Sequence, residues 1–192
     1  MIYVTGDIHG DPSRFSKEIF PEQKEMGIND CVIICGDFGL VWWKEENKTE
    51  KYWLDWLEQK PYVTAFCDGN HENFDRLNAF PVTEWNGGKV HKIRDNVIHL
   101  MRGEMYQIDG QSVFVFGGAR SHDIRGLASS EELKRDYAAG VLDRNDPEFQ
   151  RKMLQIKKYG SFTRIVGESW WKEEMPTEEE IRHGMETLKA HG

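Results

Sequence analysis

Three short polar motifs recur at even spacing in the first half of the chain, and each contains side chains that can bind a metal. They occupy residues 6–10 (Gly-Asp-Ile-His-Gly), 36–39 (Gly-Asp-Phe-Gly) and 69–72 (Gly-Asn-His-Glu). Together they offer carboxylate, imidazole and amide-oxygen ligands, a mixture that suits Mn, Fe or Zn better than the all-oxygen sites that calcium prefers. Two such ions about 3.5–4 Å apart can hold a phosphate and activate a water molecule. The motifs therefore predict a divalent-metal site, with ligands Asp7, His9, Asp37 and Asn70.

Each motif follows an apolar run, and these runs explain how the polar residues could meet. The runs at residues 2–4, 31–35 and 62–67 are rich in β-branched residues and end near glycine, which is typical of buried strands in a largely parallel sheet. The motifs then lie at the carboxyl ends of the strands, where open α/β sheets bind ligands. Asp7 and His9 are two residues apart, so from an extended chain they can point the same way.

The alternative interpretation is that Asp7 and Asp37 only stabilise turns, which is the common role of an aspartate before glycine. A single motif would favour that interpretation. Three motifs after three successive strands argue for the metal site. Asp37, from the second strand, can then bridge two ions, and Asn70, from the third, can serve the second ion.

The three motifs resemble the Asp-x-His, Gly-Asp and Gly-Asn-His-Glu pattern of the calcineurin-like metallophosphoesterases. Residues 68–74 and 116–119 resemble the small bacterial and phage members of that family. The resemblance covers nearly the whole chain. It implies that Asp7 and His9 bind the first metal, that Asp37 bridges, and that Asn70 binds the second metal. His71 is implied to contact the phosphate and to protonate the leaving oxygen.

The resemblance further implies a phosphoesterase that hydrolyses a phosphomonoester or a phosphodiester with two divalent ions. Manganese is the ion most expected, with Fe, Zn or Ni as alternatives. The substrate is a phosphate ester whose class stays open between a phosphomonoester, a cyclic or linear phosphodiester and a phosphoprotein.

The chain departs from the family pattern after the third motif. The pattern continues with a strand that ends in a histidine ligand and with a Gly-His-x-His motif, and this sequence contains no Gly-His-x-His. None of the later histidines follows a predicted strand in the expected order; they are His91, His99, His122, His183 and His191. We therefore expect a truncated member that lacks metal ligands, especially for the second ion. The alternative function is a catalytically weak metal- or phosphate-binding protein.

The order of the expected elements predicts one α/β domain over residues 1–192. Helices are expected at residues 11–24, 48–59, 73–78, 130–138, 146–158 and 177–190. Besides the three strands that precede the motifs, further strands are expected at residues 91–93, 97–100, 104–108 and 112–116. The turn Asp109-Gly110 predicts a hairpin, and Thr177 with Glu180 predicts a capping box. This order predicts two facing sheets with helices outside. The resemblance implies a four-layer αββα sandwich of two mixed sheets, the second incomplete.

An incomplete sheet has an open edge that can pair with another chain. We therefore expect a homo-oligomer or poor solubility, with apolar residues of the last predicted strand exposed, such as Val113 and Val115 or their neighbours Phe114 and Phe116.

Composition limits the other function classes. The net charge of −8 argues against a general nucleic-acid surface, for which a basic patch is expected. The sequence has no long apolar run and no basic leader with an apolar core, so we expect neither a membrane span nor export. Cys31, Cys35 and Cys67 are an odd number with no zinc-site spacing, which is typical of reduced thiols in a cytoplasmic protein.

Several further residues have two interpretations. The pairs Trp42-Trp43 and Trp170-Trp171 could line a substrate cleft, but packing between layers is favoured for each of them. Arg120 or His122 could reach a phosphate, although a polar surface loop is the simpler interpretation. His91 and His99 are expected to be buried and hydrogen-bonded rather than metal ligands.

Overall fold

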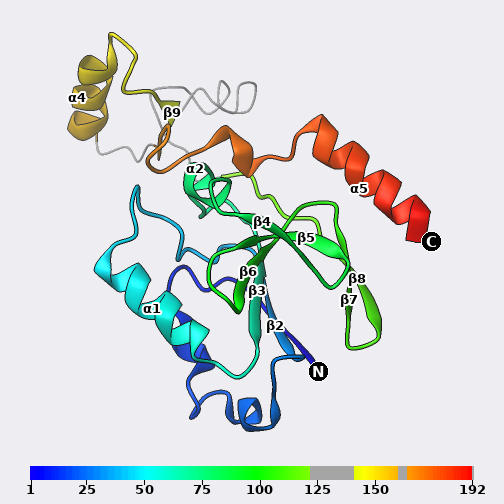
Figure 1. Cartoon of the computed structure of the whole chain (residues 1–192). Helices are drawn as coiled ribbons and strands as arrows, with labels where there is room; N and C mark the ends of the chain where they lie inside the picture. The colour runs from blue at the N-terminus through cyan, green and yellow to red at the C-terminus, as the bar shows by residue number, and fades with distance from the viewer. Residues whose placement is uncertain (122–140, 160–163, 192) are drawn as a thin grey trace.

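The structure is a computed structural model that describes residues 1–121, 141–159 and 164–191 of the chain. Its centre is a mixed sheet of six strands in the order β1-β2-β3-β6-β5-β4 (Figure 1). In chain order these strands are β1 (Ile2–Thr5), β2 (Cys31–Cys35), β3 (Val63–Cys67), β4 (Val82–Trp85), β5 (Gly88–Lys92) and β6 (Val97–Leu100). The first three and β6 run parallel, whereas β5 is antiparallel to β6 and β4 to β5. The predicted α/β class is confirmed.

The first three strands bring the three motifs to one edge of this sheet. β1 pairs with β2 as far as Thr5 and Ile34, and β2 pairs with β3 as far as Cys35 and Cys67. Each motif begins within two residues of the end of its strand. The carboxyl ends of parallel strands thus place the polar residues together, as the apolar runs predict.

A β-hairpin of β7 (Met105–Ile108) and β8 (Gln111–Phe114) covers one face of the large sheet. Its turn is the predicted Asp109-Gly110, and both residues have positive φ angles, of 51° and 74°, as a type I′ turn requires. Tyr106 and Ile108 pack in one apolar cluster with Ile33, Ala65 and Ile98 of the large sheet. The sheet that faces the large one, within the residues described, is therefore this short hairpin.

The predicted strands after residue 90 divide between the two sheets. β6 pairs in parallel with β3, so β5 and β6 extend the large sheet instead of joining β7 and β8. No strand is predicted at Val82–Trp85, yet β4 forms there and pairs with β5. The turn between them is Asn86-Gly87, with φ angles of 49° and 92°. That dipeptide is itself a hairpin signal.

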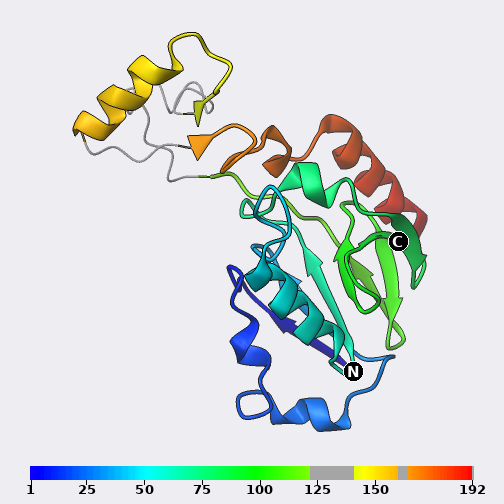
Figure 2. The same ribbon diagram turned by 60° about the vertical axis from the view of Figure 1, so that its left-hand side comes forward.

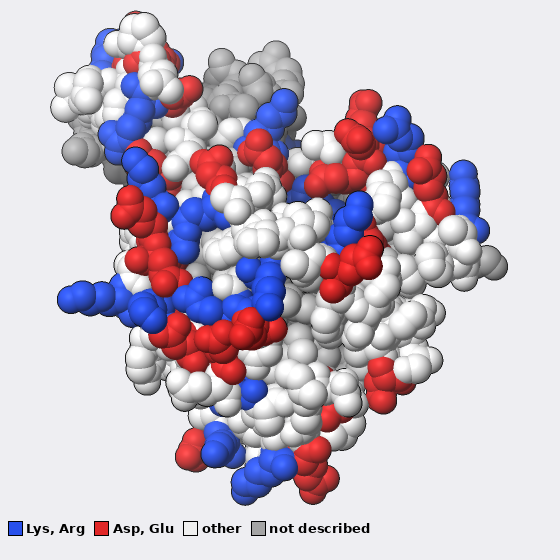
Figure 3. All heavy atoms as spheres, in the orientation of Figure 1, with Lys and Arg blue, Asp and Glu red and all other residues white. Residues whose placement is uncertain are grey.

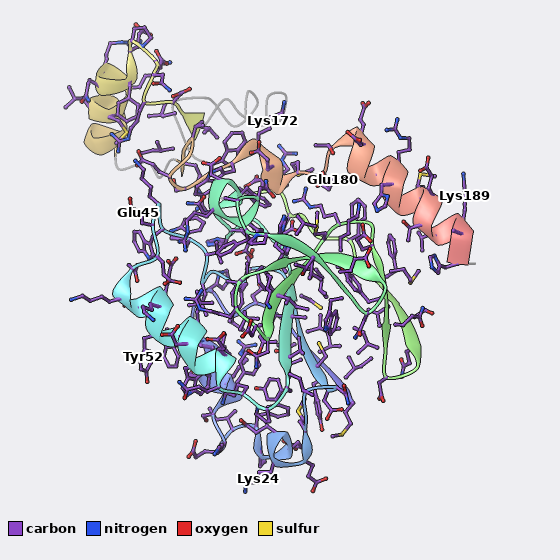
Figure 4. The ribbon with its side chains drawn as sticks, viewed as in Figure 1. Lys24, Glu45, Tyr52, Lys172, Glu180 and Lys189 are labelled. Carbon is purple, nitrogen blue, oxygen red and sulfur yellow. The ribbon has the colours of Figure 1, made fainter. Side chains whose placement is uncertain are left out.

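The helices on the other face are α1 (Lys48–Glu58) and α2 (Phe74–Leu77), both close to their predicted ranges. The Asn47 side chain caps α1 by accepting from the amides of Thr49 and Glu50. Leu54 and Leu57 form the buried stripe of α1. Tyr52 points away from the sheet into solvent (Figure 4).

The single helix predicted at residues 11–24 is wrong. The segment forms two short 3-10 helices, η1 (Pro12–Phe15) and η2 (Pro21–Glu25). Pro21 lies at the break, and a proline inside a helix removes a hydrogen bond and disfavours a helical conformation of the residue before it. The predicted start is correct, because the Asp11 side chain accepts from the Ser13 amide and caps η1.

The last third of the described chain forms smaller units around the large sheet. β9 (Val141–Leu142), β10 (Arg164–Ile165) and α4 (Phe149–Tyr159) lie beyond α2, away from the sheet (Figures 1 and 2). The helix η4 (Lys172–Glu174) connects them to α5 (Glu178–His191). The helix predicted at residues 130–138 lies outside the described residues.

The capping box of α5 is confirmed. The Thr177 Oγ1 atom accepts from the Glu180 amide at 3.2 Å, and the Glu180 carboxylate accepts from the Thr177 amide at 2.7 Å. Glu180 and Lys189 lie at opposite ends of the helix (Figure 4), which complements its dipole. Gly184 allows α5 to approach Gly103 and the ring of Phe116 closely.

The expected exposure of the last hairpin strand is only partly correct. Val115 is 7% exposed because the hairpin folds back over the large sheet, and Val113 packs against the same cluster, whereas Phe116 remains 39% exposed. In the large sheet the edge strands are β1 and β4. Pairing with a second copy of the chain stays a prediction.

The surface charges are mixed on the face that Figure 3 shows. Lys and Arg side chains are interspersed with Asp and Glu there. On α1, Lys51 and Asp55 form an ion pair. Within the residues described, no helix combines the length and apolar character that a membrane crossing needs.

Candidate metal centre

The first two motifs are joined through their backbones. The amides of Ile8 and His9 donate to the Asp37 carbonyl at 3.2 and 2.9 Å, and the Gly10 amide donates to the Phe38 carbonyl at 2.9 Å. His9 and Asp37 both have left-handed φ angles, of 44° and 46°. Such conformations are unfavourable for residues with a Cβ atom and persist where surrounding contacts enforce them, which is common at functional sites.

Three of the predicted ligands meet at this junction. The His9 Nε2 atom lies 3.8 Å from Asp7 Oδ2 and 3.8 Å from Asp37 Oδ2. Two atoms that bind one ion at about 2.0–2.2 Å can be at most about 4.4 Å apart. Both separations therefore fit a shared ion. The side chains of Asp7 and His9 are 55% and 53% exposed, whereas that of Asp37 is 13% exposed, so the site opens to solvent on the side of the first motif.

His71 lies in the same cluster. Ligand atoms of His9, Asp37 and His71 all lie within 4.8 Å of one another. The rings of His9 and His71 meet edge to face with centroids 4.7 Å apart. The imidazole of His9 and the carboxylates of Asp7 and Asp37 form a donor set that suits a transition-metal ion or zinc, and His71 lies beside it. The residues present thus fit a divalent metal ion.

Gly69 allows Asp37 to take its place in the cluster. A Cβ atom at residue 69 would overlap with Asp37 Oδ1 and would lie 2.6 Å from the Asp37 amide nitrogen. The same carboxylate oxygen accepts from the His71 amide at 3.0 Å. The third motif therefore wraps around the carboxylate of the second one, and only glycine leaves room for this contact.

Substitution Gly69→Ala is expected to weaken Mn²⁺ binding by about tenfold or more, because the methyl group must displace the Asp37 carboxylate. Gly27→Ala is the matched control, since a Cβ atom there meets nothing within 4 Å. Titration calorimetry of both variants measures the effect. Equal Mn²⁺ affinities would show that the position of Asp37 does not determine binding.

Glu72 links the third motif to the second through hydrogen bonds. It is fully buried, and its two carboxylate oxygens accept from the amides of Phe38 at 2.9 Å and Gly39 at 3.1 Å. These amides directly follow Asp37 in the chain. Glu72 therefore supports the loop that presents Asp37, a role that its place in the Gly-Asn-His-Glu motif does not by itself reveal.

Asn70, the fourth predicted ligand, has a partner that sequence reasoning misses. Its Nδ2 atom donates to Ser121 Oγ at 3.2 Å. Ser121 lies between Arg120 and His122, which could reach a phosphate but are more simply interpreted as residues of a polar surface loop. Arg120 is exposed, and His122 lies outside the described residues. The signal for Ser121 is weak, because nothing in a single serine distinguishes a buried hydrogen-bond partner from a loop residue.

A pocket of about 260 Å³ adjoins His9 and His71 and is also lined by Trp42 and Trp43. Trp42 stacks on His71 with ring centroids 5.4 Å apart, and Trp171 meets Trp42 edge to face at 5.6 Å. Trp170 and Trp171 are buried, as the packing interpretation predicts. Trp42 and Trp43 line the pocket, so for these two residues packing alone is an incomplete interpretation.

The backbone at these tryptophans is held by a buried ion pair. Glu50 accepts from the amides of Trp42 at 2.8 Å and Trp43 at 3.0 Å, and Arg76 donates to the same carboxylate at 2.8 Å. Glu50 is almost fully buried. The pocket wall is therefore fixed to α1 and α2 rather than carried on a free loop.

Among the later histidines that the structure describes, each has another partner. His91 and His99 are buried and share a hydrogen bond of 2.9 Å between their Nδ1 atoms, as expected for core histidines. His183 pairs with Glu104, and His191 bonds the Thr187 carbonyl. In the described part of the chain, the ligand cluster includes histidines only from the first and third motifs.

Asp68, the residue before the third motif, anchors the His91–His99 pair. Its carboxylate bonds His99 Nε2 at 3.1 Å and Arg102 Nε at 2.9 Å. Burial raises the pKa of Asp68, but the hydrogen bonds and charges of His99 and Arg102 outweigh burial and hold it below its usual value. Burial lowers the pKa of His91 to about 4, and the neighbouring His99 adds to this effect.

The metal-free protein is expected to lose about 2 kcal/mol of its free energy of unfolding between pH 7 and pH 5 through His91. Unfolded His91 binds a proton near its ordinary pKa of 6.5, whereas folded His91 stays neutral until about pH 4. Stability therefore falls as the pH drops through this window. Urea unfolding at the two pH values measures it. His91→Gln should flatten the dependence and the exposed His191→Gln should not; identical slopes for wild type and His91→Gln would contradict the assignment.

Comparison with known proteins places these features in a family. The model of the calcineurin-like phosphoesterase family matches residues 1–189 of the chain. The match includes all three motifs and continues to the last turn of α5. No curated protein and no solved structure matches the chain.

Proposed function

Because this chain belongs to the calcineurin-like phosphoesterase family, we propose that it hydrolyses a phosphomonoester or a phosphodiester with the help of two divalent metal ions. The observation that supports this most is the convergence of Asp7, His9 and Asp37 from two separate strands, with donor atoms 3.8 Å apart. A role in stabilising turns does not require Asp7 and Asp37 to lie close to the same ring nitrogen of His9.

The proposed ligands are Asp7 and His9 for the first ion, Asp37 as the bridge and Asn70 for the second ion. Mn²⁺ is the ion we propose, because the donor set mixes carboxylate, imidazole and amide oxygen. When bound, two such ions neutralise charge on the phosphate oxygens and lower the pKa of a water molecule so that it can attack phosphorus near neutral pH. The partly buried Asp37 is suited to the bridge because both its loop and its carboxylate are held by neighbouring motifs.

His71 is the proposed acid. Its imidazole lies in the ligand cluster and faces the pocket, so it can donate a proton to the oxygen that leaves phosphorus. Stacking on Trp42 restricts the plane of the ring, and the bond from its own amide to Asp37 fixes its backbone. The chain thus orients the proton donor relative to the bridging carboxylate.

The pocket beside the cluster is the proposed place for the organic part of the substrate. Its volume of about 260 Å³ accommodates a small group, and Trp42 and Trp43 give it an apolar wall. The substrate is thus proposed to be a small phosphate ester.

A second candidate is a metal- or phosphate-binding protein with little catalysis. The observation that favours it is the absence of a Gly-His-x-His motif from the 192 residues. In the described residues no later histidine takes the place of that motif in the cluster.

Hydrolysis of p-nitrophenyl phosphate and bis-p-nitrophenyl phosphate with added Mn²⁺ tests the proposal. We expect slow hydrolysis that requires Mn²⁺ and stops when EDTA is added. Mn²⁺ binding without turnover would favour the second candidate. Hydrolysis that continues unchanged in EDTA would contradict a metal-dependent reaction.

A further inference from the structure

The side-chain amide of Asn70 can bind a metal only through its oxygen, so its orientation decides whether it is a ligand. We infer that Ser121 and Glu174 are positioning residues that turn the Asn70 amide so that Oδ1 is left for the metal. This inference rests on the proposed function. It concerns two residues, far from Asn70 in the sequence, that none of the three motifs contains.

The three side chains form one hydrogen-bonded chain. Asn70 Nδ2 donates to Ser121 Oγ at 3.2 Å, and Ser121 Oγ donates to a Glu174 carboxylate oxygen at 2.7 Å. The Ser121 amide donates to the other oxygen of Glu174 at 2.9 Å. Ser121 is 3% exposed and Glu174 is 1% exposed, so water does not compete freely for these groups.

The direction of donation along these hydrogen bonds, from Asn70 through Ser121 to Glu174, follows from the hydrogens that each group carries. The Asn70 atom that faces Ser121 Oγ is Nδ2, which can only donate, and a hydroxyl group has a single hydrogen to donate. Ser121 gives that hydrogen to Glu174, so toward Asn70 it can only accept. Asn70 must then present its NH₂ group to Ser121. A flipped amide would set Oδ1 against the lone pairs of Ser121 Oγ and would turn the NH₂ group, which cannot bind a cation, toward the metal.

The backbone around Ser121 and Glu174 is fixed on both sides. The Ala119 amide donates to the Glu174 carbonyl at 3.1 Å, and the Gly118 amide donates to the Asp68 carbonyl at 2.9 Å. Trp171, directly before η4, donates through its indole Nε1 to Asp75 of α2 at 2.9 Å. Lys172 at the start of η4 lies above α2 (Figure 4). Glu174 is therefore held at the third motif by contacts that do not involve Asn70.

The variant Glu174→Gln is expected to reverse the direction of donation between residues 174 and 121 while keeping the size and shape of the side chain. A glutamine that accepts from the Ser121 amide must place its NH₂ group against Ser121 Oγ. The serine hydrogen is then released from residue 174 and can be donated to residue 70 once the Asn70 amide flips. We expect Mn²⁺ affinity, measured by titration calorimetry, to fall about 10–100-fold, as for other residues that orient metal ligands. Glu173→Gln is the matched control, because it removes the same charge one residue away at an exposed position.

The double variant Asn70→Asp/Glu174→Gln is expected to recover most of the lost affinity. An aspartate at residue 70 accepts the serine hydrogen with one oxygen and keeps the other for the metal. The gain in Mn²⁺ affinity from Asn70→Asp should be larger in the Glu174→Gln background than in the wild-type background. In the wild type, Ser121 donates its hydrogen to Glu174 and not to residue 70. A simple charge effect would change both backgrounds equally.

Wild-type affinity in Glu174→Gln, or no specific recovery in the double variant, would overturn the inference. A wild-type chain that binds no Mn²⁺ would instead contradict the proposed function. The orientation is then still testable in the metal-free protein, because the side-chain NH₂ signal of Asn70 in a ¹⁵N NMR spectrum reports its hydrogen bond. We expect that signal to be protected from exchange in the wild type and to shift in Glu174→Gln but not in Glu173→Gln. An Asn70 signal that is unchanged in Glu174→Gln would refute the assigned direction.

Discussion

Replacement of His71 by alanine is expected to lower kcat for Mn²⁺-dependent phosphate-ester hydrolysis by about 10²–10⁴-fold, the usual contribution of a positioned acid or base. The ring lies among the metal ligands and stacks on Trp42 beside the pocket. Its loss removes the proposed proton donor for the leaving oxygen. The effect should be larger for a poor leaving group such as an alkyl alcohol than for p-nitrophenol, because p-nitrophenolate needs little protonation.

The matched control for this variant is His191→Ala, which removes an exposed histidine whose bond to the Thr187 carbonyl lies far along α5. The control should keep wild-type kcat and KM. If His71→Ala changed KM but left kcat untouched, His71 would serve in binding alone. Full activity in His71→Ala, for both kinds of leaving group, would remove it from the reaction.

Replacement of Asp37 by alanine is expected to remove most Mn²⁺ binding, with an affinity loss beyond the roughly 10–100-fold seen for residues that only orient ligands. Asp37 is the proposed bridge, and its carboxylate lies 3.8 Å from His9 Nε2. The same carboxylate holds the His71 amide, so the third motif loses a contact as well.

Asp95→Ala is the control for the charge that Asp37→Ala removes. Asp95 is an exposed carboxylate that pairs only with Lys92 among the ion pairs of the described residues. Its loss should leave the calorimetric titration with Mn²⁺ unchanged. Equal binding by wild type and Asp37→Ala would exclude Asp37 as a ligand.

The strands and motifs that build the centre could be predicted from the sequence because their signals are local. The apolar runs before Gly6, Gly36 and Gly69 specify three parallel strands, and parallel strands bring the loops at their carboxyl ends to one edge of the sheet. The Asp109-Gly110 turn and the capping box of Thr177 and Glu180 are equally local. In each case the residues that decide the structure lie within a few positions of one another.

The missed features depend on contacts between distant segments or on competition between signals. Pro21 breaks a helix that the surrounding pattern favours, and the pairing of β6 with β3 decides which sheet receives β5. The contact of Asn70 with Ser121 spans 51 residues, and that of Ser121 with Glu174 spans 53. No periodicity or spacing indicates such contacts, because they arise only once η4 lies on the third motif.

The backbone geometry adds information that residue types do not contain. Left-handed φ angles at His9 and Asp37 are stabilised by hydrogen bonds between the two loops. A Cβ atom at Gly39 would lie 2.7 Å from the Gly10 amide nitrogen. The glycines of the first two motifs thus permit the close approach that brings His9 and Asp37 together.

Anomalous diffraction from a crystal of the chain grown with Mn²⁺ tests the central claim most directly, because it locates the ions and their ligands in one experiment. The claim is that Asp7, His9 and Asp37 hold a divalent ion at the carboxyl edge of the sheet. We predict a manganese peak bound by these three side chains, and a second peak about 3.5–4 Å away between Asp37 and Asn70. Manganese peaks elsewhere in the crystal with none at Asp7, His9 and Asp37 would contradict the account.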